Sequence, residues 1–70
     1  MSDSAITNQI RKFRFQNGEI TQAELAEQVG VTRQTINAIE AAKYAPSLEL
    51  AFKIADAFDK PLEEVFQYRK

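Results

Sequence analysis

The sequence contains no cysteine and no histidine among its 70 residues. Without cysteine the chain can form no disulfide bond and offers no thiolate as nucleophile or metal ligand. Without histidine it lacks the usual general base of hydrolytic triads, and carboxylates alone seldom bind zinc. We therefore expect a protein that is not an enzyme and that uses no metal or other cofactor.

Long apolar runs are also missing, because no stretch approaches the roughly 18–20 residues that cross a bilayer. The first residues, Met1-Ser2-Asp3-Ser4-Ala5, lack the basic and apolar segments of a signal peptide. We therefore expect a cytoplasmic protein without membrane contact. The net charge of −1, from nine basic and ten acidic residues, does not by itself attract nucleic acid. Any DNA binding must come from a local basic surface.

The composition, 44% hydrophobic and 27% charged, is typical of one small globular domain, and 70 residues leave no room for a second. We expect a single domain over residues 1–70, with a core spanning about residues 6–66. Apolar residues recur with a period of about 3.6, which is typical of helices and not of strands. Turn signals at Asn17-Gly18, Gly30, Ala45-Pro46-Ser47 and Lys60-Pro61 divide the chain into five such segments. The predicted fold class is therefore all-α, with five helices.

The first, fourth and fifth helices are predicted from their apolar stripes. The first carries Ile6, Ile10 and Phe13 and ends near Asn17-Gly18. The fourth runs from a cap at Ser47 to about Phe58, and a short fifth begins at Pro61. The expected core residues of these two helices are Leu48, Ala51, Ile54, Ala55 and Phe58, then Leu62, Val65 and Phe66. No pattern assigns a conformation to residues 67–70.

The second and third helices are predicted from their caps. Thr21 and Glu24 have the spacing of a capping box, in which each side chain accepts a hydrogen bond from the other residue's backbone N–H. Gly30 supplies the left-handed position that ends the second helix. Thr32 then caps the third helix, so only a tight turn separates the two.

One long motif carries a family resemblance, and it reads Thr21-Gln-x-x-Leu25-Ala26-x-x-x-Gly30-Val31-Thr32-x-x-Thr35-Ile36-x-x-x-Glu40. It closely resembles the helix-turn-helix of the Cro/C1-type (phage-repressor, or XRE) family. The resemblance runs from about Ile10 to Phe66 and includes Tyr44-x-Pro46-Ser47-Leu48. It implies a five-helix DNA-binding domain of the kind that acts as a small stand-alone transcriptional regulator.

The outer face of the third predicted helix is expected to read DNA bases. Ile36 and Ile39 point toward the core, and the opposite face carries Arg33, Gln34, Asn37 and Ala38. Arginine can bind guanine through two hydrogen bonds, glutamine or asparagine can do so with adenine, and alanine can touch a thymine methyl. The first residues of a recognition helix enter the major groove, so Arg33 and Gln34 are the leading candidates.

The resemblance also assigns contacts to phosphate. Gln22 matches a family position whose amide contacts phosphate beside a helix N-terminus. Arg14 matches a position where an arginine pairs with the glutamate at Glu40 and faces the DNA backbone, which makes Glu40 a positioning residue. The further candidates for phosphate contact are Thr32, Thr35 and Lys43.

The sequence departs from the family pattern after the third helix. Ala41-Ala42 stands where many members have Asn-Gly, so we expect the helix to continue for several residues, which puts the Lys43 contact in doubt. The segment Gly18-Glu19-Ile20 is one residue longer than the common loop. Phe15 lies off the main apolar stripe, so it either packs beneath this loop, which we favour, or is exposed. We expect Tyr44 to cover the apolar edge before Pro46.

A single recognition helix reads only a few base pairs, and specific affinity usually requires two half-sites. We therefore expect a homodimer that binds a palindromic double-stranded operator and represses transcription by occluding the promoter. Apolar residues near the end of the chain predict a self-association surface formed by Leu62, Val65, Phe66 and Tyr68. Alternatively, Phe66 and Tyr68 fold back over the first helix. A rival function is an antitoxin-like or other partner-binding helical module, with DNA binding secondary.

Overall fold

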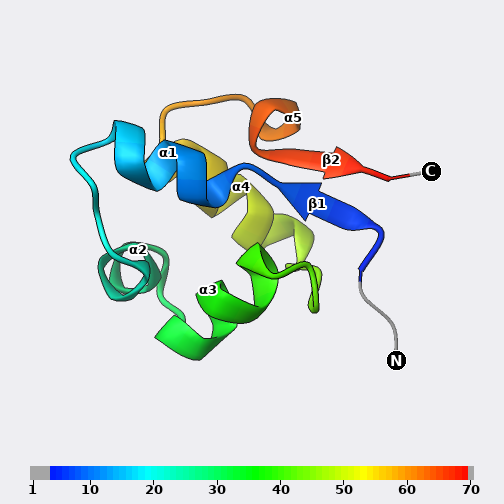
Figure 1. Ribbon diagram of the computed structural model, residues 1–70, viewed down its shortest axis with the longest axis horizontal. Coiled ribbons are helices and arrows are strands. Elements are labelled where there is room, and N and C mark those ends of the chain that lie inside the picture. Colours follow the sequence, from blue (N-terminus) through cyan, green and yellow to red (C-terminus); the bar gives the residue numbers. More distant parts are fainter. Residues whose placement is uncertain (1–3, 70) are drawn as a thin grey trace.

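The computed structural model describes residues 4–69, in which five helices accompany a two-stranded antiparallel sheet (Figure 1). The elements are β1 (Ile6–Asn8), α1 (Ile10–Gln16), α2 (Gln22–Val29), α3 (Arg33–Glu40), α4 (Leu48–Ala57), α5 (Leu62–Val65) and β2 (Phe66–Tyr68). The mainly helical class and its five helices are confirmed. The small sheet is an addition that the apolar pattern does not indicate.

The sheet joins the two ends of the described chain, since β1 pairs with β2 and Thr7 lies opposite Gln67 (Figure 1). The prediction that Ile6 belongs to the first helix is wrong, as is the placement of Phe66 in the last one. Both residues lie in strands, because the ladder gives their segments backbone partners some 60 residues away along the chain. Residues 1–3, on which the expectation that the chain lacks a signal peptide partly rests, lie outside the described residues, as does residue 70.

A hydrophobic core is shared by all five helices. Its most deeply buried large side chains are Ile10, Leu25, Ile36, Ile39, Ile54 and Val65. The ring of Phe13 packs on Phe58 with 5.7 Å between centroids, which fastens α1 to the end of α4. The prediction that Leu48 is a core residue is wrong. It is 68% exposed, because it is the first residue of α4 and lies outside the buried stripe that Leu50 begins.

The turn between α2 and α3 has the predicted caps. Thr21 Oγ1 accepts the Glu24 backbone N–H at 3.0 Å, and the Glu24 carboxylate accepts the Thr21 N–H at 2.7 Å. Gly30 ends α2 with φ of 80°, in the left-handed region. Thr32 Oγ1 accepts the Thr35 N–H at 3.2 Å and begins α3. These local hydrogen bonds give partners to backbone N–H groups that would otherwise be unpaired at the helix ends, and they fix the orientation of α3.

We expect Gly30→Val to lower the free energy of unfolding by about 1–2 kcal/mol, because a β-branched residue is strained in the left-handed region. The cost is confined to the backbone, since nothing lies within 4 Å of the position that a Cβ would occupy. Gly30→Asn is the matched control and should lose less, because asparagine tolerates this conformation. Thermal unfolding measures both. A valine variant that melts like the wild type would contradict this geometry of the turn.

The end of α3 corrects a further prediction. The helix does not continue through Ala41-Ala42 but ends at Glu40, and Ala42 adopts a left-handed φ of 60°. The Lys43 N–H donates back to the Ala38 carbonyl at 3.0 Å, which is the closing bond of a Schellman turn. Alanine thus takes the place usually held by glycine, and the Ala42 carbonyl accepts a hydrogen bond from the Ser4 N–H.

Candidate nucleic-acid interface

The outer face of α3 is presented to solvent by the burial of its inner face. Ile36 and Ile39 are 0% and 1% exposed and hold the helix against the core. Three of the four predicted base-reading residues are exposed, namely Arg33, Gln34 and Asn37. The fourth, Ala38, is half-buried. Sequence periodicity was sufficient to place these side chains, because α3 has a single buried stripe.

The predicted pairing of Arg14 with Glu40 is confirmed. Arg14 Nε donates to Glu40 Oε2 at 2.7 Å and Nη2 donates to Oε1 at 3.2 Å, so the pair is bidentate. Arg14 Nη1 also donates to the Ile20 carbonyl at 2.9 Å. Both charged side chains are only 10% exposed. The ion pair therefore ties α1 to the end of α3, and a phosphate contact by Arg14 stays a prediction.

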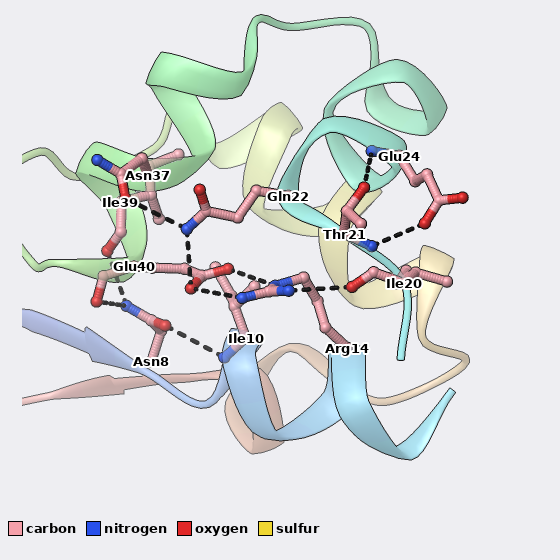
Figure 2. A network of polar contacts seen from close by, with 10 residues as sticks. All are labelled: Asn8, Ile10, Arg14, Ile20, Thr21, Gln22, Glu24, Asn37, Ile39 and Glu40. Carbon is pink, nitrogen blue, oxygen red and sulfur yellow. Dashed lines mark hydrogen bonds and ion pairs between the residues drawn. The ribbon is translucent and has the colours of Figure 1, made fainter. Parts of the chain in front are cut away.

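Gln22 extends this ion pair into a network that the sequence did not indicate (Figure 2). Its Nε2 lies 3.2 Å from Glu40 Oε1 and 3.2 Å from Asn37 Oδ1, so one amide nitrogen donates to both. Four of the predicted site residues, from α1, α2 and α3, are thereby joined in one hydrogen-bonded group: Arg14, Gln22, Asn37 and Glu40.

The remaining candidates for phosphate contact lie at the two ends of α3. The hydroxyl groups of Thr32 and Thr35 are 3.0 Å apart at its first turn, and Thr32 also caps the helix. Lys43 is exposed, just beyond the turn that closes α3. All three can be reached by a ligand that lies along α3, but two of them also have structural roles.

Asn8 is a residue that sequence reasoning missed. Its Nδ2 donates to the Ile39 carbonyl at 2.8 Å, and its Oδ1 accepts the Ile10 N–H at 3.1 Å (Figure 2). One side chain thus caps the end of α3 and the start of α1. No sequence pattern indicates this role, because Asn8 falls within the predicted first helix, where a side chain of this kind would face solvent.

An open depression of about 500 Å³ lies beside the network, lined in part by Arg11, Lys12, Phe15, Gln22 and Asn37. Arg11 and Lys12 are exposed on α1 and give this side of the molecule a local positive charge. The prediction that Phe15 packs beneath the following loop is wrong. Its ring is 52% exposed and lies 5.5 Å from the Arg11 guanidinium, because the residue falls on the outer face of α1.

The C-terminal apolar residues divide into two groups. Val65 is 0% exposed and belongs to this chain's own core, so the prediction that it forms part of a self-association surface is wrong. Phe66 is 9% exposed and also belongs to the core, but it lines an apolar groove on the surface, so its part in self-association stays a prediction. Tyr68 is 68% exposed and pairs with β1, so it does not fold back over α1. Leu62, Leu48 and Tyr68 instead line an apolar groove of about 390 Å³ between α4, α5 and β2.

The fold, the capped turn and the outward face of α3 together define a helix-turn-helix domain. A family model described as Helix-turn-helix matches residues 10–65. An uncharacterized HTH-type transcriptional regulator of Methanocaldococcus jannaschii is 49% identical over 61 residues, which cover 87% of this chain and 91% of that protein. The uncharacterized HTH-type transcriptional regulator YgzD of Bacillus subtilis is 49% identical over 59 residues, or 84% and 88% of the two chains. The chain belongs to the Cro/C1-type helix-turn-helix family of transcriptional regulators.

Solved structures show the same fold. A Bacteroides fragilis protein assigned as DNA-binding matches with a TM-score of 0.77 and 26% identity, over 89% of this chain and 98% of that one. A Neisseria protein assigned as a hypothetical transcription factor matches with a TM-score of 0.71 and 31% identity, over 79% of this chain and 62% of that one. The family is a class of transcription regulators and not a class of enzymes. Within residues 4–69, none of the helices has the length and apolar character needed to cross a membrane.

Proposed function

We propose that this protein binds a specific double-stranded DNA sequence and represses transcription there as a homodimer. The observation that carries the proposal is the outward face of α3, where Arg33 and Gln34 are exposed at the N-terminal end of a helix held by buried Ile36 and Ile39. A helix of this kind fits the major groove, and its first residues reach the base edges.

The exposed residues of α3 have distinct roles in this proposal. Arg33 and Gln34 read bases at the entrance of the helix into the groove, because both offer side chains suited to purine edges. Asn37 lies one turn further on, and Ala38 contributes an apolar contact to a thymine methyl. The complex is positioned on the DNA backbone by residues that flank α3 on both sides: Arg11, Lys12, Arg14, Thr32, Thr35 and Lys43.

The local charge supports this arrangement more than the net charge does. The chain as a whole carries −1, whereas the depression between α1 and α3 is lined by Arg11, Lys12 and Arg14, with Glu40 as the acidic partner of Arg14. Phosphate groups are therefore attracted to this side of the molecule, which favours the orientation that places α3 against DNA.

Dimerisation is proposed through the apolar groove that Leu48, Leu62 and Tyr68 line. A second copy of the chain is the occupant, since a two-fold contact places the same exposed apolar side chains of both copies against each other. Leu48 and Tyr68 are each 68% exposed, which is unfavourable for a monomer in water. A dimer with α3 helices about 34 Å apart would bind two half-sites of a palindrome and cover a promoter.

The test is selection of bound sequences from a random duplex pool, followed by affinity measurements at one fixed salt concentration. We expect an enriched palindromic site, and we expect Arg33→Ala to weaken binding to it by about 1–3 kcal/mol and to relax the preference at one position. Unfolding should change by less than about 0.5 kcal/mol, because the side chain is exposed.

Gln28→Ala is the matched control, since Gln28 is exposed on α2 outside the residues assigned to DNA contact, and its affinity should equal that of the wild type. The absence of any enriched sequence would contradict the proposal and would favour the rival, a helical module that binds a protein partner. Unchanged binding profiles for both Arg33→Ala and Gln34→Ala would contradict the assigned orientation of α3.

A further inference from the structure

We propose that a directed chain of hydrogen bonds, running from Arg14 through Glu40 and Gln22, fixes the amide of Asn37 so that it presents N–H donors to DNA and selects guanine. This inference rests on the proposed function, because it requires α3 to lie in the major groove. It concerns which base the residue selects, beyond the statement that it contacts DNA.

The chain of hydrogen bonds begins at the Arg14–Glu40 ion pair, in which the donor and the acceptor cannot exchange roles. Arg14 can only donate hydrogen bonds, and an ionised Glu40 can only accept them. Both Glu40 oxygens accept from the guanidinium, at 2.7 and 3.2 Å, and the two side chains are only 10% exposed. Burial and bidentate geometry together hold the carboxylate in one place.

The orientation of the Gln22 amide follows from this carboxylate. The Gln22 atom that lies 3.2 Å from Glu40 Oε1 has to be the donor Nε2, because the amide oxygen would face another acceptor there. The same Nε2 lies 3.2 Å from Asn37, so the Asn37 atom that faces it has to be the acceptor Oδ1. If either amide were rotated by 180°, two donors or two acceptors would face each other. The donor and acceptor roles that start at Arg14 therefore determine how the Asn37 amide is oriented on α3.

Asn37 is left with a donor group on its free side. Its Oδ1 points toward Gln22, and its Nδ2 points away from the network (Figure 2). The residue is exposed on the face of α3 proposed to enter the groove. Both Nε2 hydrogens of Gln22 are used within the network, so this amide does not donate to phosphate while the network is intact.

An amide that turns its N–H donors outward and its oxygen toward Gln22 distinguishes between the bases. Adenine presents one acceptor and one amino donor in the major groove, and its usual bidentate pairing with asparagine needs both amide atoms. Cytosine presents an amino donor, which a second donor repels. Guanine presents two acceptors, O6 and N7, whereas thymine presents one acceptor beside a methyl group. The fixed amide of Asn37 therefore matches guanine best, and not the adenine that asparagine commonly reads.

The experiment compares the sequences selected from a random duplex pool by the wild type and by Asn37→Ala, Gln22→Ala and the control Gln28→Ala. The base pair whose preference disappears in Asn37→Ala is the one that Asn37 reads. We expect it to be a G·C pair, preferred over A·T by about fivefold or more. Gln22→Ala keeps the Arg14–Glu40 pair but releases the Asn37 amide, so this preference should fall to about twofold or less at that position alone. Gln28→Ala should select the wild-type sequence.

Three outcomes would overturn the inference while leaving the proposed function in place. The position that depends on Asn37 could prefer a pair other than G·C, Gln22→Ala could retain the full preference, or Asn37→Ala could alter no position of an operator that still depends on Arg33. If the wild type enriches no operator at all, the proposed function fails and the inference fails with it. Thermal unfolding of each variant confirms that changes in preference do not come from loss of the fold.

Discussion

Glu40→Ala should lower the free energy of unfolding by about 3–5 kcal/mol, the range found when one partner of a buried ion pair is removed. The Arg14 guanidinium would stay charged in a place where its side chain is only 10% exposed. It would keep its bond to the Ile20 carbonyl but lose both bonds to the carboxylate. The cost arises from this uncompensated charge, since water reaches little of the side chain.

The chain supplies a matched control in its exposed ion pair. Lys53 and Glu49 are 3.5 Å apart on α4, with side chains 54% and 82% exposed, so Glu49→Ala should cost less than about 0.5 kcal/mol. Denaturant unfolding of both variants measures the difference. Combining Arg14→Met with Glu40→Leu should recover much of the loss, because an apolar pair needs no ionic partner. Equal losses in Glu40→Ala and Glu49→Ala would show that water solvates the Arg14–Glu40 pair.

The parts of the fold that depend on neighbouring residues could be predicted from the sequence. The capping box of Thr21 and Glu24, the left-handed Gly30 and the Thr32 cap each involve residues at most three positions apart. Because these bonds form within one turn, residue type and spacing are sufficient to locate them. The helix-turn-helix therefore follows from the sequence almost completely.

The parts that depend on distant residues could not be predicted. β1 is too short to show an alternating pattern, and it exists because β2 lies beside it. The apolar pattern with a period of about 3.6 wrongly placed Ile6 in a helix. Such a pattern depends only on which residues are apolar and cannot show that a second strand lies beside the segment. Ala42 ends α3 in a conformation that favours glycine, so the absence of glycine there wrongly predicted a longer helix.

The candidate site shows the same division. The exposed face of α3 follows from its periodicity, and the Arg14–Glu40 pair came from the family resemblance. The bonds from Gln22 to Asn37 and from Asn8 to the end of α3 depend on how separate elements pack. The proposed role of Asn37 as a donor and the role of Asn8 as a cap could therefore be recognised only in three dimensions.

We expect Leu48→Glu to convert a dimer into a monomer and to weaken operator binding by about a thousandfold or more, toward non-specific affinity. Leu48 is 68% exposed and lines the apolar groove, so a carboxylate there would be buried without a partner when two copies meet. The fold should be retained, because Leu48 is the first residue of α4 and an acidic side chain is favourable in the first turn of a helix. Removal of the residues after Val65 is a poorer test, since it would also take Phe66 out of the core.

Sedimentation of the free protein at tens of micromolar and binding to one-half-site and two-half-site duplexes together test this interface. Gln28→Glu adds the same charge to an exposed position outside the groove, and we expect it to remain dimeric and to bind both half-sites cooperatively. The monomeric Leu48→Glu chain should bind the two duplexes with equal weak affinity, because without the protein contact the second half-site contributes nothing to the first. A Leu48→Glu variant that stays dimeric would place the two-fold contact elsewhere on the surface. A wild type that is monomeric and binds both half-sites without cooperativity would contradict the dimer itself.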